Sequence, residues 1–187
     1  MGDDFEFDPP TLRTPYGTVE VTFTARHLAR NALAALATAD ALGLEIPERL
    51  DVEFTEWRNQ ELPLPGGGVL INDAWNANPV SMRAGLEHLT AVAAGRSRIA
   101  VLGDMAELGS YSDEGHREVG RAAAELADEI VAIGPQAAAY GGRRVDTVEE
   151  AVALLESMLR PGDCVLVKGA RAMALERVAE ALTGAPA

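Results

Sequence analysis

Three short segments of the chain each join an apolar run to polar side chains and small turn residues. In a parallel sheet, ligands collect beyond the carboxyl ends of the strands. If each apolar run is such a strand, we expect the polar residues to open together on one edge of the sheet. The three segments are Ile71–Pro79, Val101–Gly109 and Val167–Arg171.

The first segment places one carboxylate and three amides within seven residues, ahead of a predicted helix. Asp73 can accept hydrogen bonds from ribose hydroxyls or approach a metal-bound phosphate, while Asn76 and Asn78 both donate and accept. The alternative is an Asx-rich turn in which Asn78 or Ser81 only caps the helix. Spacing alone leaves both interpretations open.

The third segment contains Lys168, the only lysine of the chain, and Arg171 at the start of a predicted helix. Two cations beside free backbone N–H groups can hold an anion. The alternative is a surface cation pair in an acidic protein. The use of the single lysine at this point favours a functional interpretation.

The second segment offers Asp104 and Glu107, three residues apart. A metal site needs a third ligand, and His116 is as readily an ordinary residue on a helix surface. We therefore predict a capped turn with solvated acids and no metal site. Cys164 lies within an apolar run and is predicted to be a small core residue.

Several motifs are absent from the sequence. It has no Gly-x-x-x-x-Gly-Lys-Ser/Thr phosphate loop, no Cys/His spacing typical of zinc and no Gly-x-Ser-x-Gly elbow. Gly66–Gly68 precede a strand, which is the wrong side for a dinucleotide-binding turn. The residues alone indicate an α/β domain that binds an anionic small molecule.

The composition narrows the class of protein. The 187 residues carry a formal net charge of −13, which argues against binding nucleic acid or an anionic membrane surface. No run approaches the roughly 20 apolar residues that span a bilayer. One cysteine excludes an internal disulfide and suits a reducing compartment. We expect a cytoplasmic globular protein.

From residue 69 onward, short apolar runs alternate with amphipathic stretches. Strands that are apolar throughout are buried on both faces, which predicts a mostly parallel sheet with helices on either side. The expected strands are 69–72, 98–102, 129–133, 144–145 and 164–167, and the expected helices are 80–94, 113–127, 135–140, 148–159 and 171–182.

The residues before residue 69 show a different pattern. We expect a ragged start over 1–13, a half-buried strand over 18–23 and a helix over 26–42. Prolines and glycines within 61–68 predict a boundary, so the expected domains are 1–65 and 66–187. The apolar stripe of helix 26–42 should dock on its own sheet or pair with a second copy.

Three ordered motifs resemble those of one enzyme family. Asn72–Met82 is similar to the Asp-x-Tyr-Asn-Ala-Asn-Pro-x-Ser-Met signature of the Mur ligases that add D-alanyl-D-alanine to a UDP-linked tripeptide. Ile99–Gly109 resembles their Val-Leu-Gly-Asp-Met-x-Glu-Leu-Gly stretch, and Val165–Arg171 their Val-Lys-Gly-Ser-Arg stretch. Weaker matches cover His27–Asn31 and the Trp57-Arg58 pair.

The resemblance implies a Rossmann-like Mur ligase C-terminal domain, preceded by a short α+β remnant of the central ATPase domain. Such ligases use ATP and Mg²⁺ to activate the peptide carboxylate before the dipeptide amine attacks. That activity belongs to peptidoglycan synthesis, and so to cell shape and cell division. The implied small-molecule partners are the UDP-linked peptide and D-Ala-D-Ala, with no nucleic acid or membrane.

The resemblance also implies roles for individual residues. His27 and Asn31 would lie near the adenine, and Arg58 and Asp73 would contact the phosphates or ribose of ATP. The face that receives the dipeptide and its carboxylate would be lined by Asn76, Asn78, Lys168 and Arg171. Asp104 and Glu107 would shape the rim of that face.

The sequence departs from the family pattern around the nucleotide contacts. Trp75 replaces tyrosine, Ala170 replaces serine, Leu28 replaces an asparagine, and Asn59-Gln60 replaces Met-Glu. The phosphate loop, Mg²⁺ ligands and modified lysine of the central domain have no counterpart. We therefore expect no complete catalytic set, no acyl phosphate formation and no tight binding of ATP or Mg²⁺ by this chain alone.

Three hypotheses follow. The chain is a fragment of a complete ligase that lacks its N-terminal and central domains, or a stand-alone non-catalytic binding module or partner subunit. Missing domains or a second copy would contact the helix over 26–42. A sibling ligase for folate or glutamate is the third hypothesis, and the Asn-Ala-Asn-Pro-x-Ser-Met match argues against it.

Overall fold

The computed structural model describes residues 4–53 and 55–184, which form two compact units divided after Glu53. The sequence predicted the boundary twelve residues later, between 65 and 66. The division lies earlier because strand β5 (Gln60–Leu64) pairs with the sheet of the second unit. Each unit is described by itself below.

The first unit is a small α/β layer pair. Its sheet has the order β1 (Glu6–Asp8), β2 (Thr11–Thr14), β3 (Gly17–Val21) and β4 (Arg49–Leu50), and only the β3–β4 pair is parallel. The predicted strand at 18–23 and helix at 26–42 correspond to β3 and α1 (Arg26–Ala41). The expectation of a ragged start is wrong for residues 6–13, which lie in β1, β2 and the turn between them, whereas residues 1–3 lie outside the described residues.

Helix α1 docks on the sheet of its own unit. Strands β2 and β3 alternate buried and solvent-facing positions, as expected for a sheet with one covered face. The helix contributes Ala29, Ala32 and Leu36 to a core that also contains Leu12, Val19 and Val21. The apolar stripe is therefore covered within the unit, which is the first of the two expected alternatives.

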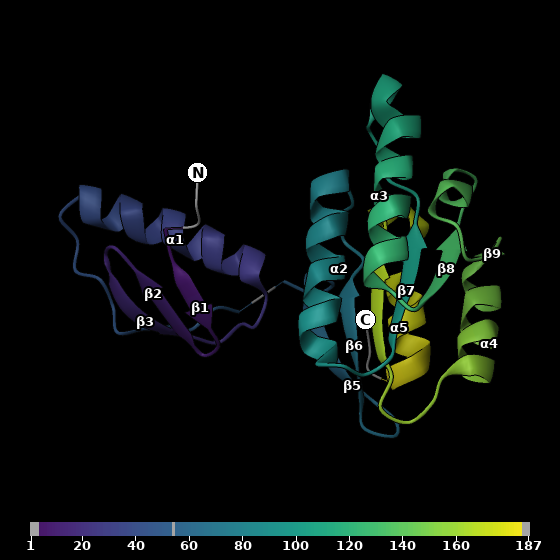
Figure 1. Cartoon of the computed structure of the whole chain (residues 1–187), viewed down its shortest axis with the longest axis horizontal. Coiled ribbons are helices and arrows are strands. Elements are labelled where there is room, and N and C mark those ends of the chain that lie inside the picture. The colour runs from purple at the N-terminus through teal and green to yellow at the C-terminus, as the bar shows by residue number, and fades with distance from the viewer. Residues whose placement is uncertain (1–3, 54, 185–187) are drawn as a thin grey trace. The chain divides into compact units, whose positions relative to one another are not determined.

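The second unit is built on a six-stranded sheet (Figure 1). Its order is β5, β6 (Gly68–Asp73), β10 (Cys164–Lys168), β7 (Arg98–Gly103), β8 (Glu129–Ile133) and β9 (Arg143–Val145). Only β5 is antiparallel, so the expected mostly parallel sheet is confirmed. Strand β5 was not predicted, because Pro63 and Pro65 argue against a central strand; an edge strand tolerates a proline at 63.

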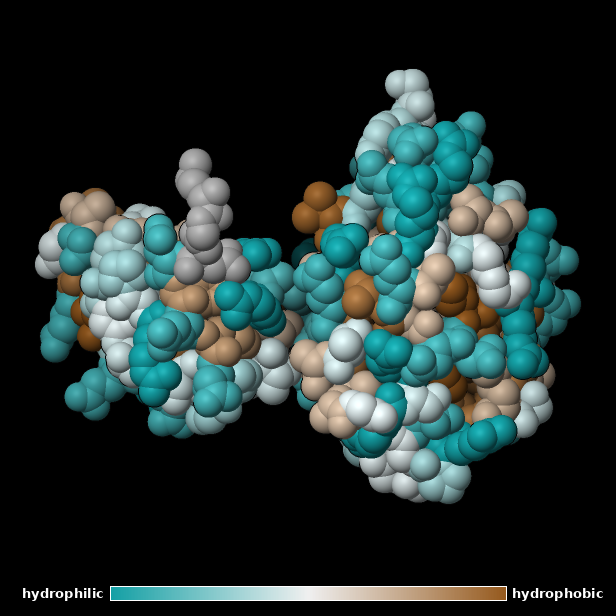
Figure 2. Space-filling view, in the orientation of Figure 1, coloured by the Kyte–Doolittle hydropathy of each residue, from teal (hydrophilic) through white to brown (hydrophobic). Residues whose placement is uncertain are grey.

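Helices cover both faces of this sheet. Helices α2 (Pro79–Ala93) and α3 (Ser112–Leu126) lie on one face, and α4 (Val148–Met158) and α5 (Glu176–Thr183) on the other. Strand β10 is buried along its whole length, with Leu166 facing the first pair of helices and Val165 and Val167 the second. The outward surface of α3 is largely hydrophilic (Figure 2).

The ends of two elements differ from expectation. The predicted helix over 171–182 is a 3-10 turn at Arg171–Met173, then Ala174 in the left-handed region at φ 51°, then α5. The predicted short helix at 135–140 is the 3-10 helix η2 (Gln136–Tyr140). Within the part of the chain that the structure describes, no helix has the length and apolar character needed to cross a bilayer.

Candidate functional site

The three polar segments meet at one edge of the large sheet. Lys168, the last residue of β10, stands opposite Asp73 of β6 on one side and Leu102 of β7 on the other. Just beyond, the backbone N–H of Ala170 donates to the carbonyl of Asp104 over 2.9 Å. The expectation that these segments open on a common edge is therefore confirmed.

Lys168 is buried at this edge and paired. Its Nζ lies 2.5 Å from Asp73 Oδ2 and donates to the carbonyl oxygen of Asn76 over 3.0 Å. The side chain is only 2% exposed. Its charge is thus already satisfied within the protein, where it ties the loop after β6 to the end of β10, instead of standing beside Arg171 as a second open cation.

Two tryptophans and two arginines form the most distinctive group at this edge, which we call the Trp–Arg cluster (Trp57, Arg58, Trp75, Arg171). The two indole rings stack with centroids 5.8 Å apart, and the backbone N–H of Trp75 donates to the backbone carbonyl of Trp57 over 3.2 Å. The Arg171 guanidinium lies 4.3 Å from the Trp57 centroid, and that of Arg58 lies 5.2 Å from Trp75. The linker before β5 is thereby fixed against the loop after β6.

The two arginines of the Trp–Arg cluster differ in their partners. Arg171 Nη1 donates to Glu176 Oε1 over 2.7 Å, and the other carboxylate oxygen of Glu176 is buried without a hydrogen-bond partner. Within residues 55–184, the Arg58 side chain makes no ion pair and contacts the ring of Trp75. A cation without a carboxylate partner in so acidic a chain is suited to an anionic ligand.

The two asparagines of the first segment are used in local turns. Asn76 Oδ1 accepts from the N–H of Ala77 over 2.9 Å. Asn78 Oδ1 accepts from Ser81 N–H over 2.9 Å, while Ser81 Oγ accepts from Asn78 N–H, so the pair forms a capping box for α2. Capping, one of the two interpretations left open, thus occupies the Asn78 oxygen, although both side chains stay exposed at the edge.

The second segment is held by buried polar contacts. Asp104 Oδ1 accepts from the N–H of Ala137 over 2.7 Å, whereas Glu107 is exposed. His116 is fully buried, which corrects its interpretation as a helix-surface residue. Its Nε2 accepts from Met105 N–H over 3.0 Å and its Nδ1 donates to the carbonyl of Ser112 over 2.7 Å. These contacts fix the loop after β7.

Tyr140 completes this support. Its ring stacks on His116 with centroids 5.4 Å apart, and its hydroxyl donates to the carbonyl of Gly103 over 3.0 Å. Burial raises the pKa of Tyr140 far above its ordinary value, and the charge of Asp104 adds to the effect. The described residues contain no group of three or more His, Cys, Asp or Glu side chains able to hold a metal ion.

The residues expected near the adenine belong to the other unit. His27 and Asn31 both lie on α1, where His27 is half-buried and Asn31 is exposed. All other expected site residues belong to the second unit. Of those, Arg58, Asp73, Lys168 and Arg171 are brought together with Asn76 through the contacts given above.

Sequence reasoning did not single out three residues that organise this edge: Asn59, His88 and Glu176. Asn59 N–H donates to Asp73 Oδ1 over 3.1 Å, and its side chain meets the buried His88. Glu176 holds Arg171. The only signal for Asn59 was its departure from the Mur ligase linker pattern, and His88 had none beyond its place on an apolar helix face.

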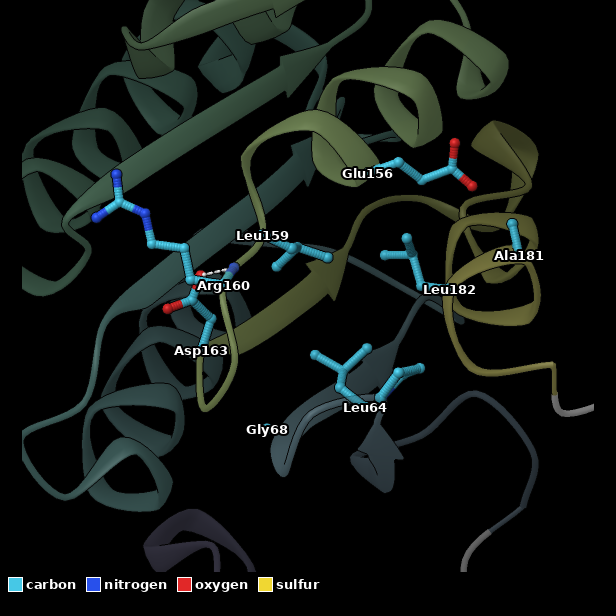
Figure 3. A pocket seen from close by; sticks show the side chains of 9 residues that line it. Leu64, Gly68, Glu156, Leu159, Arg160, Asp163, Ala181 and Leu182 are labelled. Carbon is cyan, nitrogen blue, oxygen red and sulfur yellow. Dashed lines mark hydrogen bonds between the residues drawn. The ribbon is translucent and has the colours of Figure 1, made fainter.

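A separate cavity of about 290 Å³ lies at the opposite edge of the sheet. It is bounded by Gly68, the first residue of β6, and by Asp163, which immediately precedes β10. Leu64, Leu159 and Leu182 point toward one another around it (Figure 3). Glu156 and Arg160 also line this cavity, and it contains none of the expected site residues.

Comparison with known proteins identifies the family. The family model described as "Mur ligase, glutamate ligase domain" matches residues 57–171, more than half of the chain. Three curated relatives, each named UDP-N-acetylmuramoyl-tripeptide–D-alanyl-D-alanine ligase, are 36% identical in Mycobacterium tuberculosis, 38% in Treponema pallidum and 32% in Escherichia coli. The matches cover 83%, 86% and 92% of this chain, but only 38%, 38% and 41% of the relatives.

Solved structures agree. A MurF from Acinetobacter baumannii superposes with a TM-score of 0.78 at 30% identity, over 97% of this chain and 44% of that one. The MurF ligase from Thermotoga maritima in complex with ADP shares the fold, with a TM-score of 0.82 at 23% identity over 97% of this chain and 45% of that one. The chain spans about two-fifths of the length of the relatives it matches, and it belongs to the Mur ligase family.

Proposed function

We propose that this chain supplies the C-terminal, nucleotide- and dipeptide-facing part of an ATP-dependent ligase that joins D-Ala-D-Ala to a UDP-linked tripeptide in peptidoglycan synthesis. Its curated relatives carry that name. The observation that supports the proposal best is the Trp–Arg cluster beside Asp73, at the carboxyl edge of the parallel sheet. This edge is where open α/β sheets bind ligands.

The side chains of this edge suit two anionic groups. The Arg58 guanidinium lies over the ring of Trp75 without an ion-pair partner in the second unit. We assign it to the phosphates of ATP, with Asp73 toward the ribose. Arg171 donates one N–H to Glu176, and its side chain is 44% exposed. A guanidinium can bind the carboxylate of the dipeptide through two parallel N–H donors. Asn76 and Asn78 border the same face.

Lys168 acts indirectly in this proposal. It holds Asp73 and the carbonyl of Asn76 at once, so it orients the residues that face the ligands and does not itself receive the anion. A preorganised polar edge of this kind stabilises developing charge because its dipoles need not reorient during the reaction. ATP supplies the activation of the tripeptide carboxylate, and the bound dipeptide supplies the attacking amine.

The first unit is assigned to the end of the central ATPase domain, with His27 and Asn31 near the adenine. The sequence has no phosphate loop, and the described residues hold no metal-binding group. We therefore propose that this chain alone forms no acyl phosphate and binds ATP and Mg²⁺ only weakly.

A second candidate function is a non-catalytic binding module or partner subunit. The observation that favours it is the separate core of the first unit, in which α1 is covered by its own sheet. Leu42 and Leu44 remain 70% and 59% exposed at the end of α1. These leucines are the surface that we assign to contact with further domains or with a second copy.

A chimeric enzyme tests the first function against the second. The segment of the Escherichia coli ligase that aligns with this chain is replaced by this chain, and product is measured with ATP, Mg²⁺, UDP-linked tripeptide and D-Ala-D-Ala. We expect the chimera to form product and the isolated chain to form none. A folded chimera that forms no product would support the binding-module alternative. Product from the isolated chain would contradict the proposal that this chain alone forms no acyl phosphate.

A further inference from the structure

His88 is a buried polar residue that the proposed function does not yet use. It lies on α2, and its side chain is 1% exposed. Its Nδ1 lies 2.7 Å from Asn59 Oδ1, and its Nε2 lies 3.1 Å from Glu61 Oε1. An amide oxygen and a carboxylate oxygen both accept hydrogen bonds, so both ring nitrogens of His88 face acceptors. Both contacts reach the linker and β5, 29 and 27 residues away in the sequence.

Asn59 adopts the left-handed backbone conformation, which asparagine tolerates better than most other non-glycine residues. Its φ is +50°, in the left-handed region that non-glycine residues seldom occupy. In this conformation its backbone N–H donates to Asp73 Oδ1 over 3.1 Å. The contact with His88 anchors the side chain of the same residue, so Asn59 is held both at its backbone N–H and at its side chain.

Both oxygens of the Asp73 carboxylate are consequently engaged. Oδ1 accepts from Asn59 N–H, and Oδ2 accepts from Lys168 Nζ over 2.5 Å. A carboxylate held at both oxygens cannot rotate about its Cβ–Cγ bond without losing a hydrogen bond. A continuous chain of contacts therefore runs from His88 through Asn59 and Asp73 to Lys168.

We propose that His88 is a positioning residue: through the side chain of Asn59 it sets the orientation of the Asp73 carboxylate at the ligand-facing edge. The inference rests on the proposed function only in assigning Asp73 to a ligand. A buried imidazole needs hydrogen-bond partners, and here one partner is a residue that in turn contacts Asp73.

A double-mutant cycle on the whole chain tests this coupling. His88→Leu removes the donor and keeps an apolar filler, whereas Asn59→Gly removes the carboxamide and keeps both the left-handed backbone and the N–H. The measurements are hydrogen exchange of the residue 59 amide and the ¹³Cγ chemical shift of Asp73. Each single variant should speed that exchange roughly tenfold, which corresponds to losing one supporting hydrogen bond.

The expected signature is non-additivity. The double variant should exchange no faster than either single variant, and the ¹³Cγ signal of Asp73 should move in all three. Thr90→Ala is the matched control, because Thr90 is a half-buried residue of α2 whose hydroxyl contacts Leu86 and Leu126 carbonyls instead. It should lower stability and leave the residue 59 and Asp73 signals in place.

Two results would overturn the inference. One is an unchanged Asp73 signal in a folded His88→Leu chain, and the other is additive effects of the two single substitutions. If His88→Leu fails to fold, the test rests on Asn59→Gly. An unchanged ¹³Cγ signal of Asp73 in the Asn59→Gly chain would then contradict the coupling. The measurements need no ligand, so their outcome is separate from that of the chimeric enzyme, which tests the proposed function.

Discussion

At the residue scale, Lys168 and Asp73 form the buried ion pair of the site. The ammonium is 2% exposed and the carboxylate side chain is 17% exposed, so both charges have left bulk water. Such a pair contributes little net stability, yet breaking it is costly because one charge is left without its partner. The same pair holds the loop after β6 through the carbonyl of Asn76.

Replacing Lys168 by methionine should therefore lower the free energy of unfolding by about 3 kcal/mol. Urea unfolding followed by circular dichroism measures the change. Arg83→Met is the control, because Arg83 forms an exposed pair with Glu87 and its loss should cost under about 0.5 kcal/mol. Equal effects of the two substitutions would show that the Lys168–Asp73 pair is not the buried, coupled pair described above.

Tyr140 gives a pH dependence at the same scale. Burial raises the pKa of its phenol in the folded state, whereas in the unfolded chain the phenol ionises near about pH 10. The contribution of Tyr140 to the free energy of unfolding is therefore fully present below about pH 10 and declines as the pH rises further. Tyr140→Phe should lose about 1 kcal/mol at neutral pH with the hydrogen bond to Gly103, and its stability should fall less steeply above pH 10 than that of the wild type.

Urea unfolding of both proteins between about pH 8 and 11 measures this difference, with the ordinary phenol value as reference. Parallel decline of the two proteins would contradict the burial of an un-ionised Tyr140.

The residues of the site divide by how far their contacts reach in sequence. Asp73, Lys168 and Arg171 were predictable because each ends or follows an apolar strand, and parallel strands bring those positions together. Asn59, His88 and Glu176 were not, since their roles depend on which helix face meets which loop. His116 was misjudged for the same reason: helix periodicity does not reveal that Met105 N–H and Ser112 carbonyl enclose its ring.

At the scale of elements, the loop after β6 and helix α2 are joined by the Asn78–Ser81 capping box. Asn78→Ala should lower the free energy of unfolding by about 1 kcal/mol, because an N–H at the start of α2 loses its acceptor. Asn78→Asp should keep most of the stability, since aspartate caps equally well and its charge suits a helix N-terminus. Thermal unfolding of both variants tests the assignment; an Asp variant as unstable as the Ala variant would contradict capping as the role of Asn78.

Most elements follow from hydrophobic periodicity, and the exceptions have physical reasons. The five parallel strands and helices α2, α3 and α4 lie within a residue or two of expectation. Strand β5 was not predicted because proline usually argues against a strand, although an edge strand needs fewer N–H donors. Strands β1 and β2 are too short for an alternating pattern to be recognised in the sequence. Ala174 interrupts the predicted helix with a positive φ, although no glycine or proline at that position indicates a break.

At the scale of the whole molecule, two units have separate cores, and the boundary after Glu53 has a direct consequence. A chain beginning at residue 55 keeps β5 and the Trp–Arg cluster and should unfold cooperatively. A chain beginning at residue 66, the boundary expected from sequence, lacks β5, Trp57 and Asn59 and should be clearly less stable. Urea unfolding of the two truncated chains measures the difference in stability. Equal unfolding midpoints would support the boundary between residues 65 and 66 that the sequence predicted.

We propose that the edge carrying the Trp–Arg cluster faces the dipeptide, and steady-state kinetics of the chimeric ligase test this claim. Arg171→Ala is compared with Arg177→Ala, whose guanidinium pairs with Glu149 outside the Trp–Arg cluster. We predict that Arg171→Ala raises the KM for D-Ala-D-Ala by roughly tenfold or more, as expected for loss of a charged hydrogen bond, and that Arg177→Ala leaves it unchanged. Equal KM values for the two variants would contradict the claim.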